Sequence, residues 1–265
     1  MDNRLKIRES KSIAVKVGTS TITYPNGKLN MRRIGTLTRV LTDIKNRGLD
    51  VVLVTSGAIG VGSTRLGFEQ RPTLMREKQA AAAVGQAVLM QIYQSHFTDY
   101  NQQVAQVLVT KDDMREDERT ENIINTFHTL WEMGVIPIVN ANDTISTVEI
   151  GFSDNDTLAA HLASLLKMDT LVLFTDIDGM YNKDPKSNPD AVKIDVIEEI
   201  TDEILAMAGD KGSTFSVGGM SAKLTAATEC MENGINMVIA HGEDPELLYN
   251  ILDGDNIGTL FAGKK

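Results

Sequence analysis

Cysteine and clustered histidine are scarce in this sequence, and each scarcity excludes a class of protein. The 265 residues contain one cysteine, Cys230, so no intrachain disulfide can form. Cys230 lies in a helical pattern with no histidine near it in the sequence, so we predict a small buried residue rather than a nucleophile. The four histidines are scattered, with neither an HExxH motif nor metal-ligand spacing. A protein-built zinc site is therefore not expected.

Long apolar runs and excess positive charge are also missing. Apolar runs end after a few residues, whereas a membrane-spanning helix needs about 20. The first twelve residues mix charges and lack an apolar core, so we predict no signal peptide and a cytoplasmic protein. The net charge of −10, from 26 basic and 36 acidic residues, argues against nucleic acid as a partner. A small anion can still bind where lysines and backbone N–H groups are concentrated.

Short β-branched runs alternate with longer helical patterns along the chain. The predicted strands are Ile13–Val17, Val51–Thr55, Val104–Val109, Ile136–Asn140, Leu171–Thr175 and Met237–Ala240. The predicted helices include one that Asn30 caps and Gly48 ends, and others over Leu74–Phe97, Glu121–Met133, Thr157–Leu166, Ser221–Asn233 and Pro245–Leu252. This alternation predicts an α/β fold, with a mostly parallel sheet covered on both faces, as a single domain over residues 1–265. A hairpin excursion is predicted near Thr144–Phe152.

Glycine, hydroxyl and acidic residues follow four of the predicted strands. In open parallel sheets, ligands bind beyond the carboxyl ends of the strands, so these segments are the candidate site. The segments are Lys16–Ser20, Thr55–Ala58, Asn140–Asp143 (with Ser153–Asp156 downstream) and Thr175–Gly179.

Two lysines stand beside glycine-containing segments. Lys16 ends an apolar strand and precedes Gly18 and Thr19, whose backbone N–H and hydroxyl groups suit a phosphate. A strand-end lysine that extends to water is an equally good interpretation of Lys16 alone. Lys223 follows Ser216–Ala222, a segment with two glycines before a predicted helix. Taken alone, Lys223 is better interpreted as one solvated surface lysine among many. Together with the helix N-terminus it could bind phosphate. The preceding segment, Gly209–Thr214, has the composition of a loop that closes over nucleotide.

Ser56, Gly57 and Ala58 could bind a carboxylate through a hydroxyl and backbone N–H groups at a helix start. A serine N-cap predicts the same local geometry without a ligand. Asp143, Asn155 and Asp156 offer acceptors for an ammonium group, although carboxylates are common in turns. The sequence contains no GxxxxGK[ST], and the glycines between Gly57 and Gly62 do not match GxGxxG. A dehydrogenase therefore remains a weak alternative.

Several motifs occur in the order seen in glutamate 5-kinases, and the likeness runs from about Ser12 to Phe261. They are Val15–Ser20, Val54–Ile59, Pro137–Asn140 with Asn142 and Asp143, Asp154–Asp156, Tyr181 with Asp184–Pro185 and Asn188–Pro189, and Gly218–Ser221 with Lys223. On these residues the chain resembles the glutamate 5-kinase family. The resemblance implies the amino acid kinase fold, an αβα sandwich. It also implies ATP-dependent phosphorylation of L-glutamate to glutamate 5-phosphate, the first step of proline biosynthesis.

The resemblance also implies roles for individual residues. Lys16 and Lys223 would contact the ATP phosphates and the transferring group, and Asp156 would orient both lysines. Glutamate would be bound by Ser56, Asp143 and Asn155, beside Gly57 and Ala58. The remaining nucleotide contacts would come from Gly18, Thr19, Thr175, Asp176, Val217, Gly218, Gly219, Met220, Ser221 and Ala222. ATP with Mg²⁺ is the implied co-substrate, and the metal ligands stay unassigned because nucleotide and water can hold the ion.

The chain departs from the family pattern at three positions. Val217 and Ala222 stand where the family often has threonine, and Ala141 stands where it often has glutamate. The chain ends shortly after Phe261, so we expect a form without the C-terminal PUA domain that many members carry. Proline is an expected feedback inhibitor. We expect a homo-oligomer, and the helix over Leu74–Phe97 could form the interface or belong to the core.

Other acceptors and another class of function remain open at this point. N-acetylglutamate kinase, aspartokinase, carbamate kinase and UMP kinase share the fold. An N-acetyl substrate lacks the ammonium group that Asp143, Asp154 and Asp156 would suit, and the strand-end loops have few arginines for the phosphate of UMP. A nucleotide-sensing protein without turnover is the alternative from a different class, and the presence of both Lys16 and Lys223 argues against it.

Overall fold

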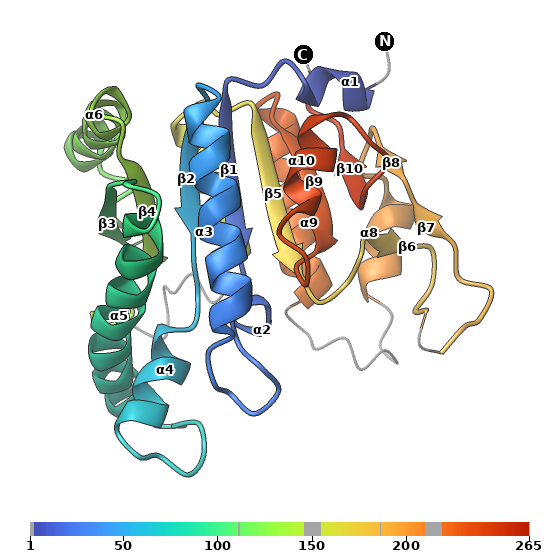
Figure 1. The fold of residues 1–265 in the computed structure, drawn as a ribbon. Coiled ribbons are helices and arrows are strands. Elements are labelled where there is room, and N and C mark those ends of the chain that lie inside the picture. Colours follow the sequence, from blue (N-terminus) through green and yellow to red (C-terminus); the bar gives the residue numbers. More distant parts are fainter. Residues whose placement is uncertain (1–2, 111, 146–154, 186, 210–218, 265) are drawn as a thin grey trace. The chain divides into compact units, whose positions relative to one another are not determined.

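A computed structural model of the protein describes every residue except 1–2, 111, 146–154, 186, 210–218 and 265 (Figure 1). Contacts divide the chain into two compact units. Unit 1 combines Met1–Lys16 with Asp156–Lys265, and unit 2 is the continuous segment Val17–Asn155. The single domain expected over residues 1–265 stays a prediction. Among the described residues, none of the helices has both the length and the apolar character needed to cross a membrane.

The strands of unit 2 are parallel. They are β2 (Asp50–Val54), β3 (Val104–Val109) and β4 (Ile136–Ala141), in the order β3-β4-β2. Leu53 pairs with Ile138 and Val107 with Val139, so the carboxyl ends of β2 and β4 lie at one edge. All residues of β4 are buried, which explains why its sequence, IPIVNA, does not alternate between apolar and polar side chains.

In the described part of unit 2 the helices are α2 (Thr19–Ile22), α3 (Met31–Asn46), α4 (Ala58–Arg65), α5 (Met75–Thr98) and α6 (Asp117–Glu132). The predicted ends of α3 are confirmed. The Asn30 side chain accepts a hydrogen bond from the Arg33 backbone N–H at 3.0 Å, and Gly48 follows the helix with φ of +95°. The face of α3 with Ile34, Leu37 and Leu41 is buried, and this helix packs against β2 and α5 (Figure 1).

Helices α4 and α5 touch backbone to backbone. A Cβ atom added to Gly62 would lie 1.8 Å from the carbonyl oxygen of Ala81, and one added to Gly85 would lie 1.8 Å from that of Ala58. Neither distance is possible for real atoms, so both positions require glycine. This close approach fixes the first turn of α4, which follows the candidate residues Ser56 and Gly57, against the middle of α5.

Unit 1 contains β1 (Ser12–Val17), β5 (Thr170–Thr175), β8 (Val196–Ile197), β9 (Asn236–His241) and β10 (Thr259–Phe261), in the order β1-β5-β9-β10-β8. Strand β9 is parallel to β5 and antiparallel to β10. A separate ribbon pairs β6 (Met180–Tyr181) with β7 (Lys193–Ile194). The helices are α1 (Asn3–Ile7), α7 (Asn155–Leu165), α8 (Asp202–Gly209), α9 (Gly219–Glu232) and α10 (Leu247–Leu252).

All six predicted strands are present, with bounds that agree to within a residue or so. The short elements α1, α2, β6, β7, β8 and β10 were not predicted, because segments of two to five residues show no hydrophobic period. The eight-residue helix α8 was missed as well. Cys230 is 0% exposed, as expected, and burial raises the pKa of its thiol. Most of the predicted hairpin over Thr144–Phe152 and of the loop over Gly209–Thr214 lies outside the described residues.

Candidate functional site

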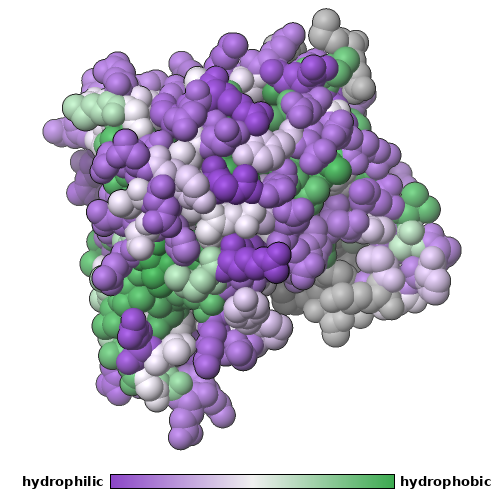
Figure 2. Space-filling model, in the orientation of Figure 1, coloured by the Kyte–Doolittle hydropathy of each residue, from purple (hydrophilic) through white to green (hydrophobic). Residues whose placement is uncertain are grey.

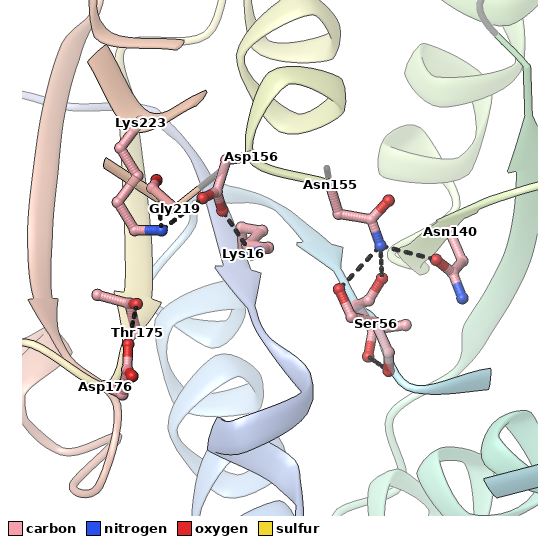
Figure 3. Close-up of polar contacts among 10 residues, drawn as sticks. Lys16, Ser56, Asn140, Asn155, Asp156, Thr175, Asp176, Gly219 and Lys223 are labelled. Atoms are coloured by element: carbon pink, nitrogen blue, oxygen red, sulfur yellow. Dashed lines mark hydrogen bonds and ion pairs between the residues drawn. The ribbon is translucent and has the colours of Figure 1, made fainter. Parts of the chain in front are cut away.

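Three charged side chains of unit 1 form a buried ionic cluster. Lys16 at the end of β1 pairs with one carboxylate oxygen of Asp156. Lys223 of α9 lies 2.8 Å from the other oxygen, and its ammonium group also donates to the carbonyl of Gly219 at 3.3 Å (Figure 3). Lys16, Asp156 and Lys223 are 6%, 1% and 8% exposed. The surface interpretations of both lysines are therefore wrong, because each is buried against a carboxylate.

The charges of this cluster do not cancel. Burial raises the pKa of Asp156, but the nearby charges of Lys16 and Lys223 and their hydrogen bonds outweigh it, so the pKa lies below the usual range. The carboxylate is therefore ionised at neutral pH and offsets one of two positive charges. Asp156 stands in the first turn of α7, where the helix dipole also favours an anion. The cluster keeps one net positive charge, which suits it to an anionic ligand.

Other residues predicted to contact ATP lie on elements of unit 1. Thr175 ends β5, and its hydroxyl donates to the carboxylate of Asp176 at 3.0 Å. Gly219, Met220, Ser221 and Ala222 form the first turn of α9, directly before Lys223. Val217 and Gly218 fall outside the described residues. The structure thus brings Lys16, Asp156 and Lys223 together, and it places the other residues at the carboxyl end of a strand or the amino end of a helix.

A second polar cluster, in unit 2, is neutral. The side-chain nitrogen Nδ2 of Asn155 lies 2.7 Å from the carbonyl oxygen of Thr55, 2.8 Å from Oγ of Ser56 and 2.9 Å from Oδ1 of Asn140. Three oxygens around one atom identify that atom as the donor, because an oxygen there would face three acceptors. The amide orientation of Asn155 is thereby fixed, and Figure 3 shows its Oδ1 pointing away from these oxygens.

Ser56 does not cap α4. The N-cap residue is Gly57, whose φ of +101° lies in the left-handed region that favours glycine. No side chain caps this helix, and the Ser56 hydroxyl instead accepts from Asn155. The serine-cap interpretation is therefore wrong. A Cβ atom added at Gly57 would also lie 3.1 Å from Cδ1 of Ile22, so a side chain at this position would be crowded as well as strained.

Asp143 follows β4 and is half-buried. Burial raises the pKa of its carboxyl group, and the charge of Arg71 offsets only part of this effect. A partly desolvated carboxylate of this kind gains from a cationic ligand. Gly18 and Thr19, the remaining predicted residues, are the N-cap and first residue of α2, and the exposed hydroxyl of Thr19 leaves the helix start accessible.

Two residues of the neutral cluster were not predicted. Asn140 was recognised only as the end of a strand, yet its side chain accepts from Asn155 and from the Ala141 backbone N–H and donates to Oε1 of Gln86 at 2.9 Å. Gln86 lies in the alanine-rich middle of α5, and it is 7% exposed. A glutamine on the buried face of a helix was the only sequence signal for it.

Within the described part of the chain, no group of three or more histidine, cysteine or acidic residues is arranged to hold a metal ion. Asp156, the carboxylate of the ionic cluster, is engaged by two lysines.

Comparisons with known proteins identify the family of the chain. The model of the amino acid kinase family matches residues 11–241. A glutamate 5-kinase of Clostridium perfringens is 51% identical, and the match covers 99% of both chains. Glutamate 5-kinases of Clostridium acetobutylicum and Listeria monocytogenes are 49% and 47% identical, and they match 95% and 99% of this chain.

Solved structures of related fold are more distant in sequence. The isopentenyl phosphate kinase of T. acidophilum superposes with a TM-score of 0.65 at 21% identity, covering 94% of this chain and 99% of the other. The UMP kinase of Bacillus anthracis gives a TM-score of 0.65 at 16% identity, covering 95% of both chains. These likenesses confirm the predicted α/β fold class with its mostly parallel sheet.

Proposed function

The chain belongs to the amino acid kinase family, among the glutamate 5-kinases, and we infer that it transfers the γ-phosphoryl group of ATP to the side-chain carboxylate of L-glutamate. The product is L-glutamate 5-phosphate, and the reaction is the first step of proline biosynthesis. The observation that carries the inference at the level of residues is the buried cluster of Lys16, Asp156 and Lys223, which holds a net positive charge.

The lysines of this cluster act on the phosphates. An ammonium group has three N–H donors, and among the described residues Lys16 uses one on Asp156 while Lys223 uses two, on Asp156 and Gly219. The remaining donors can contact the γ-phosphoryl oxygens as charge develops on them. Because both lysines are held by one carboxylate, little reorganisation is needed when the reaction takes place. Asp156 is then a positioning residue, not a general base.

The remaining nucleotide contacts come from the ends of β5 and α9. Thr175 and Asp176 supply a hydroxyl and a carboxylate for the nucleoside part of ATP, and the first turn of α9, with Gly219 and Ser221, supplies backbone and hydroxyl donors. Gly18 and Thr19 add donors for phosphate at the start of α2. Mg²⁺ enters as part of the Mg-ATP substrate, bound to the nucleotide.

The neutral cluster and Asp143 bind the amino acid. The fixed amide of Asn155 presents Oδ1, an acceptor suited to the ammonium group of glutamate, and Asp143 adds a negative charge. Ser56 and the backbone N–H groups of Gly57 and Ala58 suit a carboxylate. This donor and acceptor set is built for a free amino acid with charges of both signs, and it does not suit an N-acetylated one.

The reaction needs no general base on the protein. A glutamate side chain with a pKa of about 4.3 is already ionised at neutral pH, so its carboxylate attacks directly. The barrier lies in bringing this anion to a polyanionic nucleotide in line with the breaking bond. Lys16 and Lys223 reduce that repulsion. Catalysis therefore depends on charge and alignment, which agrees with the engagement of Asp156 by two lysines.

Three further features belong to this proposal. A cytoplasmic location is supported by the single cysteine, because disulfides are rare in cytosolic proteins.

A homo-oligomer is supported by the outer side of α5, where Figure 2 shows apolar surface and Val84 is 37% exposed. Proline, the end product of the pathway, would act as a feedback inhibitor by competing for the residues that bind glutamate.

The test is ADP release from Mg-ATP with glutamate, N-acetylglutamate, aspartate and UMP as separate acceptors, with hydroxylamine added to trap acyl phosphate. We expect release with glutamate alone, together with a hydroxamate. Turnover with another acceptor and none with glutamate would contradict the assigned substrate. ATP binding without turnover on any acceptor would favour a sensing protein instead.

A further inference from the structure

One face of α5 carries two buried polar residues that have no part in the mechanism described above. Gln86 and Tyr93 are seven positions apart, about two helical turns, so they lie on the same side of the helix. They are 7% and 0% exposed, and Leu89 between them is buried. Polar groups are costly on such a face unless they are hydrogen-bonded. Their partners therefore indicate why they are there.

Gln86 and Tyr93 each contact a residue at the carboxyl end of a strand, and each of those two residues also contacts Asn155. Oε1 of Gln86 accepts from Nδ2 of Asn140 at 2.9 Å, and the hydroxyl of Tyr93 lies 2.8 Å from that of Thr55. The Asn140 side chain and the Thr55 carbonyl supply two of the three oxygens around Nδ2 of Asn155. Helix α5 therefore lies directly behind the groups that orient the Asn155 amide.

The contact with Gln86 supports the orientation in which the oxygen of the Asn140 amide faces Asn155. Oδ1 of Asn140 accepts from Asn155 and from the Ala141 backbone N–H, at 2.9 Å in each case. If the Asn140 amide turned over, its nitrogen would face two donors and its oxygen would face Gln86. The Ala141 backbone N–H can only donate, so it excludes the reversed arrangement. Oε1 of Gln86 reinforces the observed arrangement because it satisfies the nitrogen of Asn140 on the opposite side, while Nε2 of Gln86 has no hydrogen-bond partner among the described residues.

We propose that Gln86 is a positioning residue for the amino-acid substrate, an inference that rests on the proposed function. Through Asn140 it holds the Asn155 amide with Oδ1 directed to the ammonium group of glutamate. Without it, the nitrogen of Asn140 loses its acceptor and the Asn140 side chain is held less firmly, so the oxygen that helps to fix the Asn155 amide is less well positioned. The effect falls on glutamate and not on ATP. Tyr93 supports the same amide through Thr55, with a weaker effect, because its partner is a hydroxyl that Asn155 does not contact.

The test compares two exchanges of similar length. Gln86→Met removes the acceptor, whereas Gln86→Glu keeps an oxygen at the same place. We expect Gln86→Met to raise the glutamate KM, and the glutamate Kd from calorimetric titration, by ~10-fold or more, while the KM for ATP changes by less than ~2-fold. Gln86→Glu should restore most of the glutamate affinity. Leu89→Val, on the same face, is the control: it should lower the thermal midpoint without changing the glutamate KM.

An unchanged glutamate KM in Gln86→Met, or equal increases of both KM values, would overturn the positioning role while leaving the kinase function intact. If Gln86→Met does not fold, Tyr93→Phe takes its place, since it removes a hydroxyl and keeps the ring. We expect a ~3-fold rise of the glutamate KM for Tyr93→Phe, from the loss of one neutral hydrogen bond. No rise there would overturn the proposal as well. Wild-type protein that fails to phosphorylate glutamate would overturn both the proposed function and this inference.

Discussion

The two units bury polar groups in different ways. In unit 1 the buried cluster is ionic, with Lys16 and Lys223 on one carboxylate. In unit 2 it is neutral, with the Asn155 amide surrounded by oxygens of Thr55, Ser56 and Asn140 (Figure 3). Asn155 and Asp156 are consecutive in the sequence, yet each belongs to a different cluster. In the proposed function, the ionic cluster supplies charge for an anionic nucleotide, and the neutral one supplies direction for a small amino acid.

This difference predicts a ranking of mutational effects. Removing one partner from a buried ionic cluster leaves an uncompensated charge, at a cost of about 3–5 kcal/mol. Removing one partner from a neutral cluster leaves a single unsatisfied group, at about 1–3 kcal/mol. The following experiments test that ranking, beginning with the largest expected effect.

Asp156→Asn should break the ionic cluster. Two buried lysines would then share a neutral amide, and we expect a loss of about 3–5 kcal/mol in the free energy of unfolding, measured with urea at pH 7. Asp190→Asn is the control, because Asp190 pairs with Lys183 at the surface. A loss below about 1 kcal/mol for Asp156→Asn would show that the lysines do not depend on this carboxylate.

The pH dependence of stability gives a second measurement on the same residue. The pKa of Asp156 is lowered in the folded protein, so its contribution is present above the unfolded value of about 3.9 and is lost as the pH falls through the folded value. Wild-type stability should therefore approach that of Asp156→Asn in acid. A constant difference between the two proteins from pH 7 to acid would contradict the lowered pKa.

Lys16→Ala and Lys223→Ala should each reduce turnover by roughly 10²–10³-fold, since one contact to transition-state charge contributes about 3–4 kcal/mol. Steady-state kinetics with Mg-ATP and glutamate measure this. Lys11→Ala is the matched control, because Lys11 is exposed on the same unit and its only described hydrogen bond uses the backbone. Near wild-type turnover in either variant would remove that lysine from the site.

Gly85→Ala should destabilise unit 2. Alanine is normally favoured over glycine in a helix by about 1 kcal/mol, but here its Cβ would overlap the Ala58 carbonyl, and overpacking costs about 1–3 kcal/mol. We expect a lower thermal midpoint, and a higher glutamate KM because α4 follows Ser56 and Gly57. Gly67→Ala is a useful comparison, since a Cβ there meets nothing within 4 Å although φ is +73°. If the thermal midpoint falls no further in Gly85→Ala than in Gly67→Ala, the contact between α4 and α5 opens easily.

Asp143→Ala should raise the glutamate KM by roughly 10-fold or more, with little change in the KM for ATP, because a charge-assisted hydrogen bond contributes about 1.5–3 kcal/mol. The raised pKa adds a test in the wild type. As the pH falls, Asp143 should become protonated earlier than an ordinary aspartate, and glutamate affinity should decline in that range. Equal effects of Asp143→Ala on both KM values would argue against the assignment.

Local patterns were sufficient for most of the fold. The helical spacing of Ile34, Leu37 and Leu41 predicted α3, and Asn30 and Gly48 predicted its ends, because caps act within one turn. The apolar runs predicted β1, β2, β4 and β5 because buried parallel strands are apolar on both faces. The two-residue strands β6, β7 and β8 could not be predicted, because two residues are too few to show a hydrophobic period and their pairing partners are distant in the sequence.

The candidate site was predicted in its residue types and not in its contacts. Lys16, Lys223 and Ser56 were singled out, but each had an interpretation without a ligand, and only the structure showed that the surface-lysine and serine-cap interpretations are wrong. Lys223 meets a carboxylate 67 positions earlier, and Asn155 meets a carbonyl 100 positions earlier. No local period encodes such a pairing. Gln86 and Asn140 were missed for the same reason, since each is unremarkable until the other is placed beside it.

The sequence by itself determined the α/β class, the apolar strands, the ends of α3 and the excess of negative charge, because hydrophobic period, caps and charge are properties of neighbouring residues. Tertiary structure alone decided that two lysines share one carboxylate and that the Asn155 amide has one orientation. These features depend on which polar groups are buried together, and burial makes an unsatisfied charge or amide costly enough to select a single arrangement.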